Sequence, residues 1–235
     1  MKGKVICVEA KGRKISGYLP EAAERCACCY LLCGDCEQTL MPELARGMER
    51  GWTGKPMAVL SLEGAQWDRD YTPWPAQGPK GRAFSGGAPA FLQTLVEEII
   101  PWAEAELPIL AGRAHRCLAG YSLGGLAALY GGLETGAFER LASVSGSLWY
   151  PGWVEYLQGR LATASLPLGV YCSLGKAEAK TRFGPMAACA ADTGRTVELF
   201  RASLGEQKVC FEWNNGPHFF ELTERMLKAL RHLSL

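Results

Sequence analysis

The sequence predicts an α/β protein built on a doubly wound, mostly parallel sheet flanked by helices. Short apolar stretches typical of buried strands alternate with stretches of helical periodicity along nearly the whole chain. A Gly-x-Ser-x-Gly motif lies where one such strand passes into a helix. With 235 residues, the chain has the length of one α/β domain, and we expect a single domain over residues 1–235.

Composition and charge exclude several classes of protein. Hydrophobic residues make up 48% and charged residues 21%, and the formal net charge is +1 with both signs interspersed. This balance argues against a nucleic-acid partner or a membrane-binding face. The N-terminus lacks the long apolar run of a signal peptide, and a cytoplasmic location is expected.

Ten cysteines are unusual for such a chain, and half of them lie between Cys26 and Cys36. Without a signal peptide we expect free cysteines that serve as small buried hydrophobes rather than a disulfide framework. Cys33-x-x-Cys36 has the spacing of a redox pair or of half a zinc site, so metal or redox work stays open as a minor alternative.

The first quarter of the chain predicts an edge hairpin followed by two buried strands. Residues 4–9 and 13–19 have strand character and are joined by a Lys-Gly turn. Residues 28–33 form a continuous apolar run, as expected of a strand buried on both faces. Apolar side chains at helical spacing predict a helix near 40–48, and 57–61 is the next buried strand.

Residues 62–87 form a long irregular stretch that is rich in Gly, Pro and Trp. A loop longer than about 15 residues inside one domain is usually functional. We expect some of its side chains to pack on the core and others to form one wall of a substrate pocket.

The middle of the chain continues the alternation. Residues 91–107 form an amphipathic pattern with a proline at which we expect a kink, and 115–119 is a short apolar strand. A helix is expected over 123–133, then a strand over 141–146 and a short helix near 154–161.

The last part of the chain predicts two further strands and two helices. The strands are expected over 168–174 and 209–213. A helix is expected over 197–204, its start left open by a turn or two, and the chain ends in a helix over 220–232.

Ser122 is the candidate nucleophile. Gly120 and Gly124 flank it at the Gly-x-Ser-x-Gly spacing, and small residues are needed there because a serine between strand and helix has a strained, crowded backbone. The following helix points its free N–H groups and positive dipole end at the serine. The motif alone is common by chance, but the strand before it and the helix after it favour a nucleophile elbow.

His218 is the candidate base, because a serine hydroxyl needs a histidine to remove its proton. His115 opens a strand beside an arginine, and His232 lies in the last turn of a helix, where a histidine suits the dipole. His218 follows the last strand, at the carboxyl edge of the sheet where open α/β folds place their sites. The alternative is a loop histidine that packs on the two phenylalanines after it.

Glu178 is the candidate acid, since it follows the strand between serine and histidine by four residues. Asp192 resembles a helix residue, and Glu206 belongs to a surface turn. Glu178 could instead cap the next helix. The order Ser122, Glu178, His218 is the order found in α/β-hydrolases. An oxyanion hole would use the backbone N–H of Leu123 and one from the loop after an early strand, for which Asp35 is the candidate.

Four segments resemble the putative-esterase branch of the α/β-hydrolases, which includes esterase D-like enzymes, enterochelin esterases and feruloyl esterases. These segments are Asp68–Trp74, Ala119–Leu126, Ser145–Tyr150 and Gly216–Phe219. The resemblance implies a serine carboxylesterase with Ser122 as nucleophile and His218 as base. Glu178 stands at the family's acid position, where many members carry aspartate. The resemblance also implies a shallow pocket without a separate lid domain, because the chain holds no large insertion.

The expected substrate is a small-molecule ester, and no metal or organic cofactor is implied. The alternatives are acyl transfer to an alcohol by the same triad and a non-catalytic binding module on a hydrolase scaffold. Aryl, sugar and siderophore esters all fit, and the sequence leaves a monomer or a homodimer open. The candidate substrate-binding residues are Arg69, Tyr71, Trp74, Tyr121, Trp149 and Tyr150.

Overall fold

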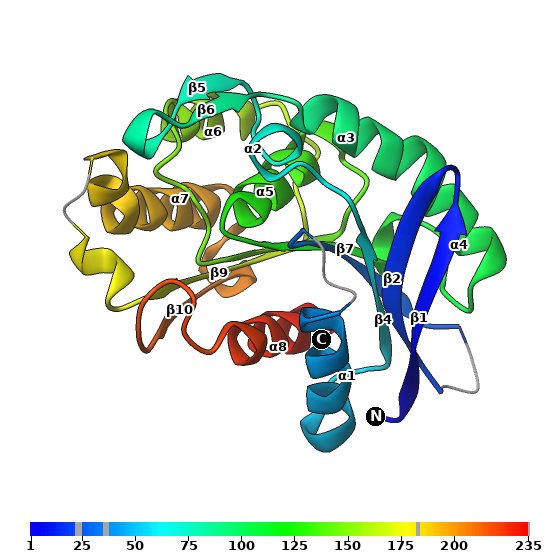
Figure 1. Ribbon diagram of the computed structural model, residues 1–235. Coiled ribbons are helices and arrows are strands. Elements are labelled where there is room, and N and C mark those ends of the chain that lie inside the picture. The colour runs from blue at the N-terminus through cyan, green and yellow to red at the C-terminus, as the bar shows by residue number, and fades with distance from the viewer. Residues whose placement is uncertain (22–24, 35–37, 182–183, 235) are drawn as a thin grey trace.

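A central sheet of eight strands with helices on both faces forms the frame of the protein (Figure 1). The computed structural model describes residues 1–21, 25–34, 38–181 and 184–234. The strands of the sheet are β1 (Gly3–Ala10), β2 (Arg13–Pro20), β3 (Ala27–Leu32), β4 (Met57–Leu62), β7 (Arg116–Tyr121), β8 (Arg140–Val144), β9 (Gly169–Gly175) and β10 (Val209–Asn214). The α-helices are α1 (Leu40–Gly51), α2 (Trp67–Asp70), α3 (Ala88–Thr94), α4 (Ile100–Glu106), α5 (Leu123–Thr135), α6 (Trp153–Arg160), α7 (Cys189–Leu204) and α8 (Leu222–Leu233).

The strand order is β1-β2-β4-β3-β7-β8-β9-β10. β1, β2 and β4 pair antiparallel, and every pairing from β4 to β10 is parallel. The predicted α/β class with a mostly parallel sheet is therefore confirmed. The chain winds outward on one side through β3 and β4 and then returns to β7 on the other side of β3. Open α/β sheets bind ligands beyond the carboxyl ends of their strands at such a reversal.

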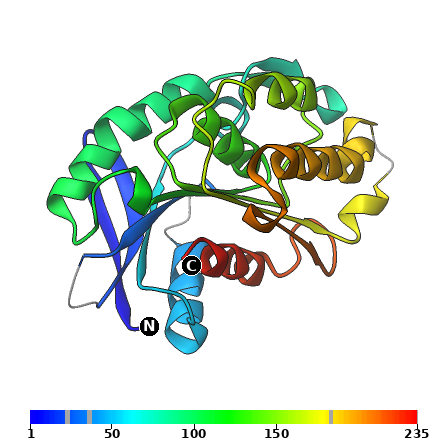
Figure 2. The ribbon, with the colours of Figure 1, turned by 180° about the vertical axis from the view of Figure 1, so that it is seen from behind.

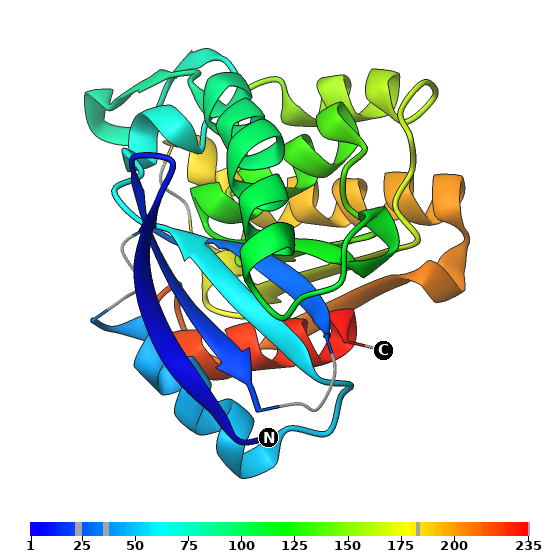
Figure 3. The same ribbon diagram turned by 90° about the vertical axis from the view of Figure 1, so that its right-hand side faces the viewer.

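The helices form one layer on each face of the sheet. α1 and α8 cover one face, while α3, α4, α5, α6 and α7 cover the other (Figures 2 and 3). Side chains of β3 pack alternately into two apolar cores, one on each face of the sheet. Tyr30 and Leu32 pack on one face, and Cys29 and Leu31 pack on the other. This double burial explains the uninterrupted apolar run of that strand.

One segment is more regular than the sequence predicted. Residues 62–87 contain α2 and a small hairpin of β5 (Pro75–Gln77) and β6 (Ala83–Ser85). α7 begins at Cys189, about two turns before position 197, which agrees with the start that the sequence left open. The Trp153 indole of α6 donates to the Thr196 hydroxyl of α7 at 3.0 Å and joins the two helices.

The expected kink at Pro101 takes the form of a π-helical turn. α3 and α4 are joined by Leu95–Ile99, which has the wider π-helical hydrogen bonding, and Pro101 follows directly. Proline has no N–H to donate and its ring crowds the preceding turn, so a local change in winding lets the helix continue.

Eight cysteines among the described residues are free, and most of them are buried as expected. Cys33 differs, because it is disulfide-bonded. The expectation of free thiols was wrong at this position, whose spacing to Cys36 is that of a redox pair. Cys36 itself lies outside the described residues.

No helix in the described part of the chain is long and apolar enough to cross a lipid bilayer.

Candidate active site

Ser122 lies at the sharp turn between β7 and α5, with a strained backbone of φ 57° and ψ −121°. Glycine is required at both flanking positions because there is no room there for a Cβ atom. A Cβ atom on Gly120 would lie 2.1 Å from the carbonyl oxygen of Gly124, and one on Gly124 would lie 1.9 Å from that of Leu32. The turn therefore has the geometry of a nucleophile elbow.

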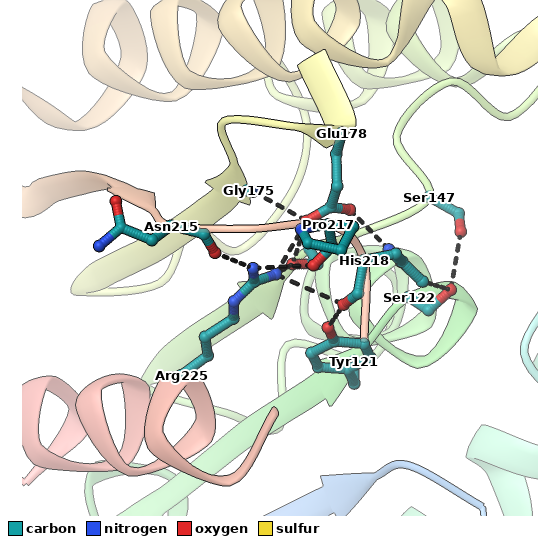
Figure 4. A network of polar contacts seen from close by, with 10 residues as sticks. Tyr121, Ser122, Ser147, Gly175, Glu178, Asn215, Pro217, His218 and Arg225 are labelled. Atoms are coloured by element: carbon teal, nitrogen blue, oxygen red, sulfur yellow. Dashed lines mark hydrogen bonds and ion pairs between the residues drawn. The ribbon is translucent and has the colours of Figure 1, made fainter. Parts of the chain in front are cut away.

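The structure brings Ser122, His218 and Glu178 into one hydrogen-bonded row (Figure 4). Ser122 Oγ lies 3.0 Å from His218 Nε2, and His218 Nδ1 lies 2.5 Å from Glu178 Oε2. The three residues follow the carboxyl ends of β7, β10 and β9, which meet at the same edge of the sheet. When Nδ1 carries the proton, the imidazole donates to the carboxylate and accepts from the serine hydroxyl.

Glu178 is buried, and its second oxygen is fully engaged. Oε1 accepts hydrogen bonds from the backbone N–H of Gly175 at 2.8 Å and from Ser145 Oγ and Arg225 Nη1 at 2.9 Å each. Burial by itself would raise the pKa of this carboxyl. The hydrogen bond and charge of His218, with the bonds from Ser145 and Gly175, bring the pKa below its ordinary value, so the group is ionised at neutral pH.

The loop after β8 reaches both ends of this row. Ser145 has a positive φ of 46° and donates to the acid, whereas Ser147 Oγ lies 3.3 Å from Ser122 Oγ. The Ser147 N–H also donates to the Ser122 carbonyl at 2.9 Å. One short segment thereby links the candidate nucleophile to the candidate acid.

Leu123, the first residue of α5, lines the pocket beside Ser122. Its N–H belongs to the first turn of the helix, where N–H groups have no partner within the helix, and it can therefore face a developing oxyanion. Asp35, the other expected donor, lies outside the described residues. Just before it, the N–H of Gly34 donates to the Tyr71 hydroxyl at 3.1 Å.

A pocket of about 760 Å³ opens at the row of Ser122, His218 and Glu178, a volume within the usual range for small-molecule sites. Its walls are mostly apolar and aromatic, and they also include two cationic side chains. Besides the row itself, the wall includes Trp67, Phe84, Trp149, Met186 and Phe219, together with Lys80 and Arg82.

Of the six candidate substrate-binding residues, Trp149 lines this pocket. Among the described residues, the other five candidates are not part of its wall. Tyr71 is fully buried, and Arg69 forms an ion pair with Asp70 at 2.7 Å. The Tyr121 hydroxyl donates to the carbonyl of His218 from outside the pocket.

Trp74 and Tyr150 support the wall from behind. The Trp74 indole donates to the carbonyl of Pro151 at 2.9 Å, and the Tyr150 hydroxyl donates to the carbonyl of Trp74 at 2.5 Å. Tyr150 in turn packs against Phe84, with ring centroids 5.3 Å apart. Aromatic side chains in a loop serve core and pocket equally well, so composition alone did not separate the two roles.

Arg225 is the main site residue that the sequence analysis missed. It lies on α8 with only 1% of its surface exposed, although arginine is rarely buried unless it is paired. A signal was available, because position 225 falls on the apolar stripe of this helix. The other members of that stripe are Leu222, Met226, Ala229, Leu230 and Leu233.

A nucleophile elbow at the carboxyl edge of a mostly parallel, doubly wound sheet defines an α/β-hydrolase fold. The chain belongs to the family described as "Putative esterase", whose family model matches residues 10–218. The predicted family is thereby confirmed.

One curated relative and three solved structures illustrate the similarity. Uncharacterized protein YbbA of Bacillus subtilis (strain 168) is 28% identical over 132 residues, which are 54% of this chain and 51% of YbbA. The match thus spans about half the length of that curated relative.

The solved structures cover 99% of this chain in each case. Siderophore hydrolase EstA from Aspergillus nidulans has a TM-score of 0.75 at 18% identity, with 94% of its chain covered. An IroE-like serine hydrolase from Shewanella oneidensis has a TM-score of 0.76 at 20% identity, with 80% of its chain covered. The enterobactin esterase FES from Shigella flexneri, with enterobactin present, has a TM-score of 0.71 at 16% identity, with 58% of its chain covered. At such identities the likeness shows a shared fold.

Proposed function

We propose that this protein is a serine hydrolase that cleaves carboxylic esters of small molecules through an acyl-enzyme. One observation carries the proposal: Ser122, His218 and Glu178 form a continuous row with separations of 3.0 and 2.5 Å, and all three line one pocket. Membership of an esterase family supports it. A serine hydroxyl aligned on an imidazole that an ionised carboxylate orients is the arrangement that makes serine nucleophilic.

In the proposed mechanism, Ser122 Oγ attacks the ester carbonyl while His218 Nε2 takes its proton. Glu178 Oε2 holds the Nδ1 proton and stabilises the imidazolium that forms. The N–H of Leu123 donates to the oxyanion, with a second donor from the loop after β3. The imidazolium then protonates the leaving alcohol, and water activated by His218 releases the acid and restores the serine.

The pocket supports an ester that carries a flat, apolar group. Trp67, Phe84 and Trp149 offer ring faces, and the pocket volume suits a ligand of drug-like size. Several proteins of the same fold are described as siderophore or enterobactin hydrolases, and one is described as a ferulic acid esterase. We therefore propose aryl esters as the first substrates to examine.

The test is release of p-nitrophenol from short-chain and aryl esters by the parent protein and by Ser122→Ala. The substitution is expected to lower kcat by about 10⁴-fold or more. A fluorophosphonate probe should label the parent and leave the variant unlabelled.

Ser203→Ala provides the matched control, because this serine lies exposed on α7 and donates to the Leu199 carbonyl. It should hydrolyse the esters and take up the probe like the parent. Equal rates for the parent and Ser122→Ala would refute the proposed function.

A further inference from the structure

Arg225 makes an unusual set of contacts for a helix residue on the far side of the sheet from the pocket. Its Nη1 donates to Ser145 Oγ at 2.8 Å, to Glu178 Oε1 at 2.9 Å and to the carbonyl of His218 at 3.4 Å. Its Nη2 donates to the carbonyls of Asn215 at 2.5 Å and Pro217 at 3.0 Å. One guanidinium group thus joins the acid to the loop that carries the histidine (Figure 4).

From these contacts we propose that Arg225 is a positioning residue that aligns Glu178 with His218 and sets the lower pH limit of catalysis. The proposal rests on the proposed esterase function. Burying an arginine costs free energy unless it is paired and fully hydrogen-bonded, and stability alone is a weak reason to retain a buried ion pair. The contacts indicate what this pair does instead.

The first effect is on the orientation of the carboxylate. Arg225, Ser145 and Gly175 all donate to Oε1 of Glu178. Rotation of the carboxylate would break these three bonds, so Oε2 stays directed at His218 Nδ1.

The second effect is on the loop after β10. This loop has no strand partner beyond Asn214 in the described sheet, and Arg225 binds three of its carbonyls, those of residues 215, 217 and 218. The planar guanidinium fixes their relative positions in a way that a single ammonium group does not. His218 is therefore held both at its backbone carbonyl and at its ring Nδ1 atom.

The third effect is electrostatic. An isolated carboxylate would attract a proton to the imidazole with its full charge, but Glu178 shares its charge with Arg225 at 2.9 Å. The cation offsets part of the attraction of the carboxylate for a proton on the imidazole, so removing the cation is expected to move the acid limb of catalysis to higher pH.

Two further titratable groups face this pair, Tyr121 from β7 and Cys189 from α7. Burial raises the pKa of the Tyr121 hydroxyl above its usual value. Burial, helped by the charge of Glu178, raises the pKa of the Cys189 thiol to about 12. Both are uncharged near neutral pH and add no charge to the pair.

The test compares the pH profiles of kcat/KM for the parent, Arg225→Gln and Arg225→Lys. Glutamine keeps a hydrogen-bond donor but removes the charge, and we expect the acid limb to move up by about one pH unit. We also expect kcat/KM on the plateau to fall about 10²-fold, because the loop contacts are lost. Lysine keeps the charge and loses the planar fork, so its acid limb should stay within about 0.3 pH units of the parent while its rate falls about tenfold.

Arg231→Gln is the matched control on the same helix, since Arg231 pairs only loosely with Glu224 at 3.4 Å near the surface. It should leave both the rate and the acid limb unchanged. A purely structural role for Arg225 would lower the rate of its variants without moving the limb.

An acid limb at the parental pH in folded Arg225→Gln, or an equal shift in the lysine variant, would overturn the proposal. If circular dichroism shows that Arg225→Gln does not fold, Arg225→Met takes its place, because it also removes the charge while filling the buried site with an apolar side chain. An acid limb displaced upward in folded Arg225→Met supports the proposal, and a parental limb in it contradicts the proposal. A parent without Ser122-dependent hydrolysis would instead refute the proposed function, and this inference would fall with it.

Discussion

The catalytic side of the pocket and its opposite wall are built on different principles. On the catalytic side, directional hydrogen bonds join Ser122, His218 and Glu178, and Glu178 is held in turn by buried donors on its other oxygen. On the opposite wall, rings pack on rings, as Phe84 does on Trp149 with centroids 6.4 Å apart. Directional hydrogen bonds fix atoms to within a fraction of an ångström, whereas ring packing tolerates replacement of one apolar side chain by another. Changes on the first side should therefore alter kcat, and changes on the second should alter KM.

The largest effect is expected at the elbow, where Gly124→Ala would place a Cβ atom 1.9 Å from the Leu32 carbonyl. Because backbone lies on both sides of this contact, neither can move without distorting β3 or α5. We expect the free energy of unfolding to fall by about 3 kcal/mol and ester hydrolysis to be lost. Urea denaturation and the p-nitrophenyl assay measure the two effects.

Gly159→Ala is the control for this change, because a Cβ atom at this position in α6 meets nothing within 4 Å. Alanine should raise the free energy of unfolding by about 0.5–1 kcal/mol through its higher helix propensity. Parental stability and activity in Gly124→Ala would show that the elbow has more room than its geometry indicates.

A smaller effect is expected from Glu178→Gln, which keeps the shape of the acid and removes its charge. A neutral amide cannot stabilise the imidazolium and presents an N–H₂ group to either His218 or Arg225. We expect kcat to fall about 10³-fold while KM changes less than about threefold. Steady-state kinetics on one aryl ester measure both.

Asp192→Asn is the matched control, since Asp192 is one of the two other carboxylates considered for this role and lies on α7. It should retain the parental kcat. A loss in Asp192→Asn comparable to that in Glu178→Gln would reassign the acid.

The smallest effect is expected on the opposite wall, where Trp149→Ala removes one ring face from the pocket. We expect KM for aryl esters to rise about tenfold, with kcat within about twofold, because lost apolar contact weakens ground state and transition state alike. Trp213→Ala removes a tryptophan of β10 that is 46% exposed and absent from this wall, and it should change neither constant. A fall in kcat with unchanged KM in Trp149→Ala would contradict the division of kcat and KM between the catalytic side and the opposite wall.

The sequence by itself determined the alternation of strands and helices and the position of the elbow. These features depend on local patterns: apolar runs of strand length, helical spacing, and the two glycines around Ser122. Chain order also led to Glu178 and His218, because strands that follow one another in a parallel sheet place their ends at one edge. The fold and the family predicted on this basis are confirmed.

The tertiary structure decided what the side chains of loops and helix faces contact. It placed Trp149 in the pocket wall and turned Tyr71, Trp74 and Tyr150 toward the core, although all are aromatic residues of similar loops. The direction of a side chain in an irregular segment depends on distant partners, which local patterns do not encode.

Arg225 shows the same limit most clearly. Helical periodicity placed it on the buried face of α8, but only the packing of that helix against β7, β8 and β9 brought it to Glu178, which lies 47 residues away in sequence. A charge in an apolar stripe must find its partner across the fold, and the identity of that partner is fixed by the assembled sheet.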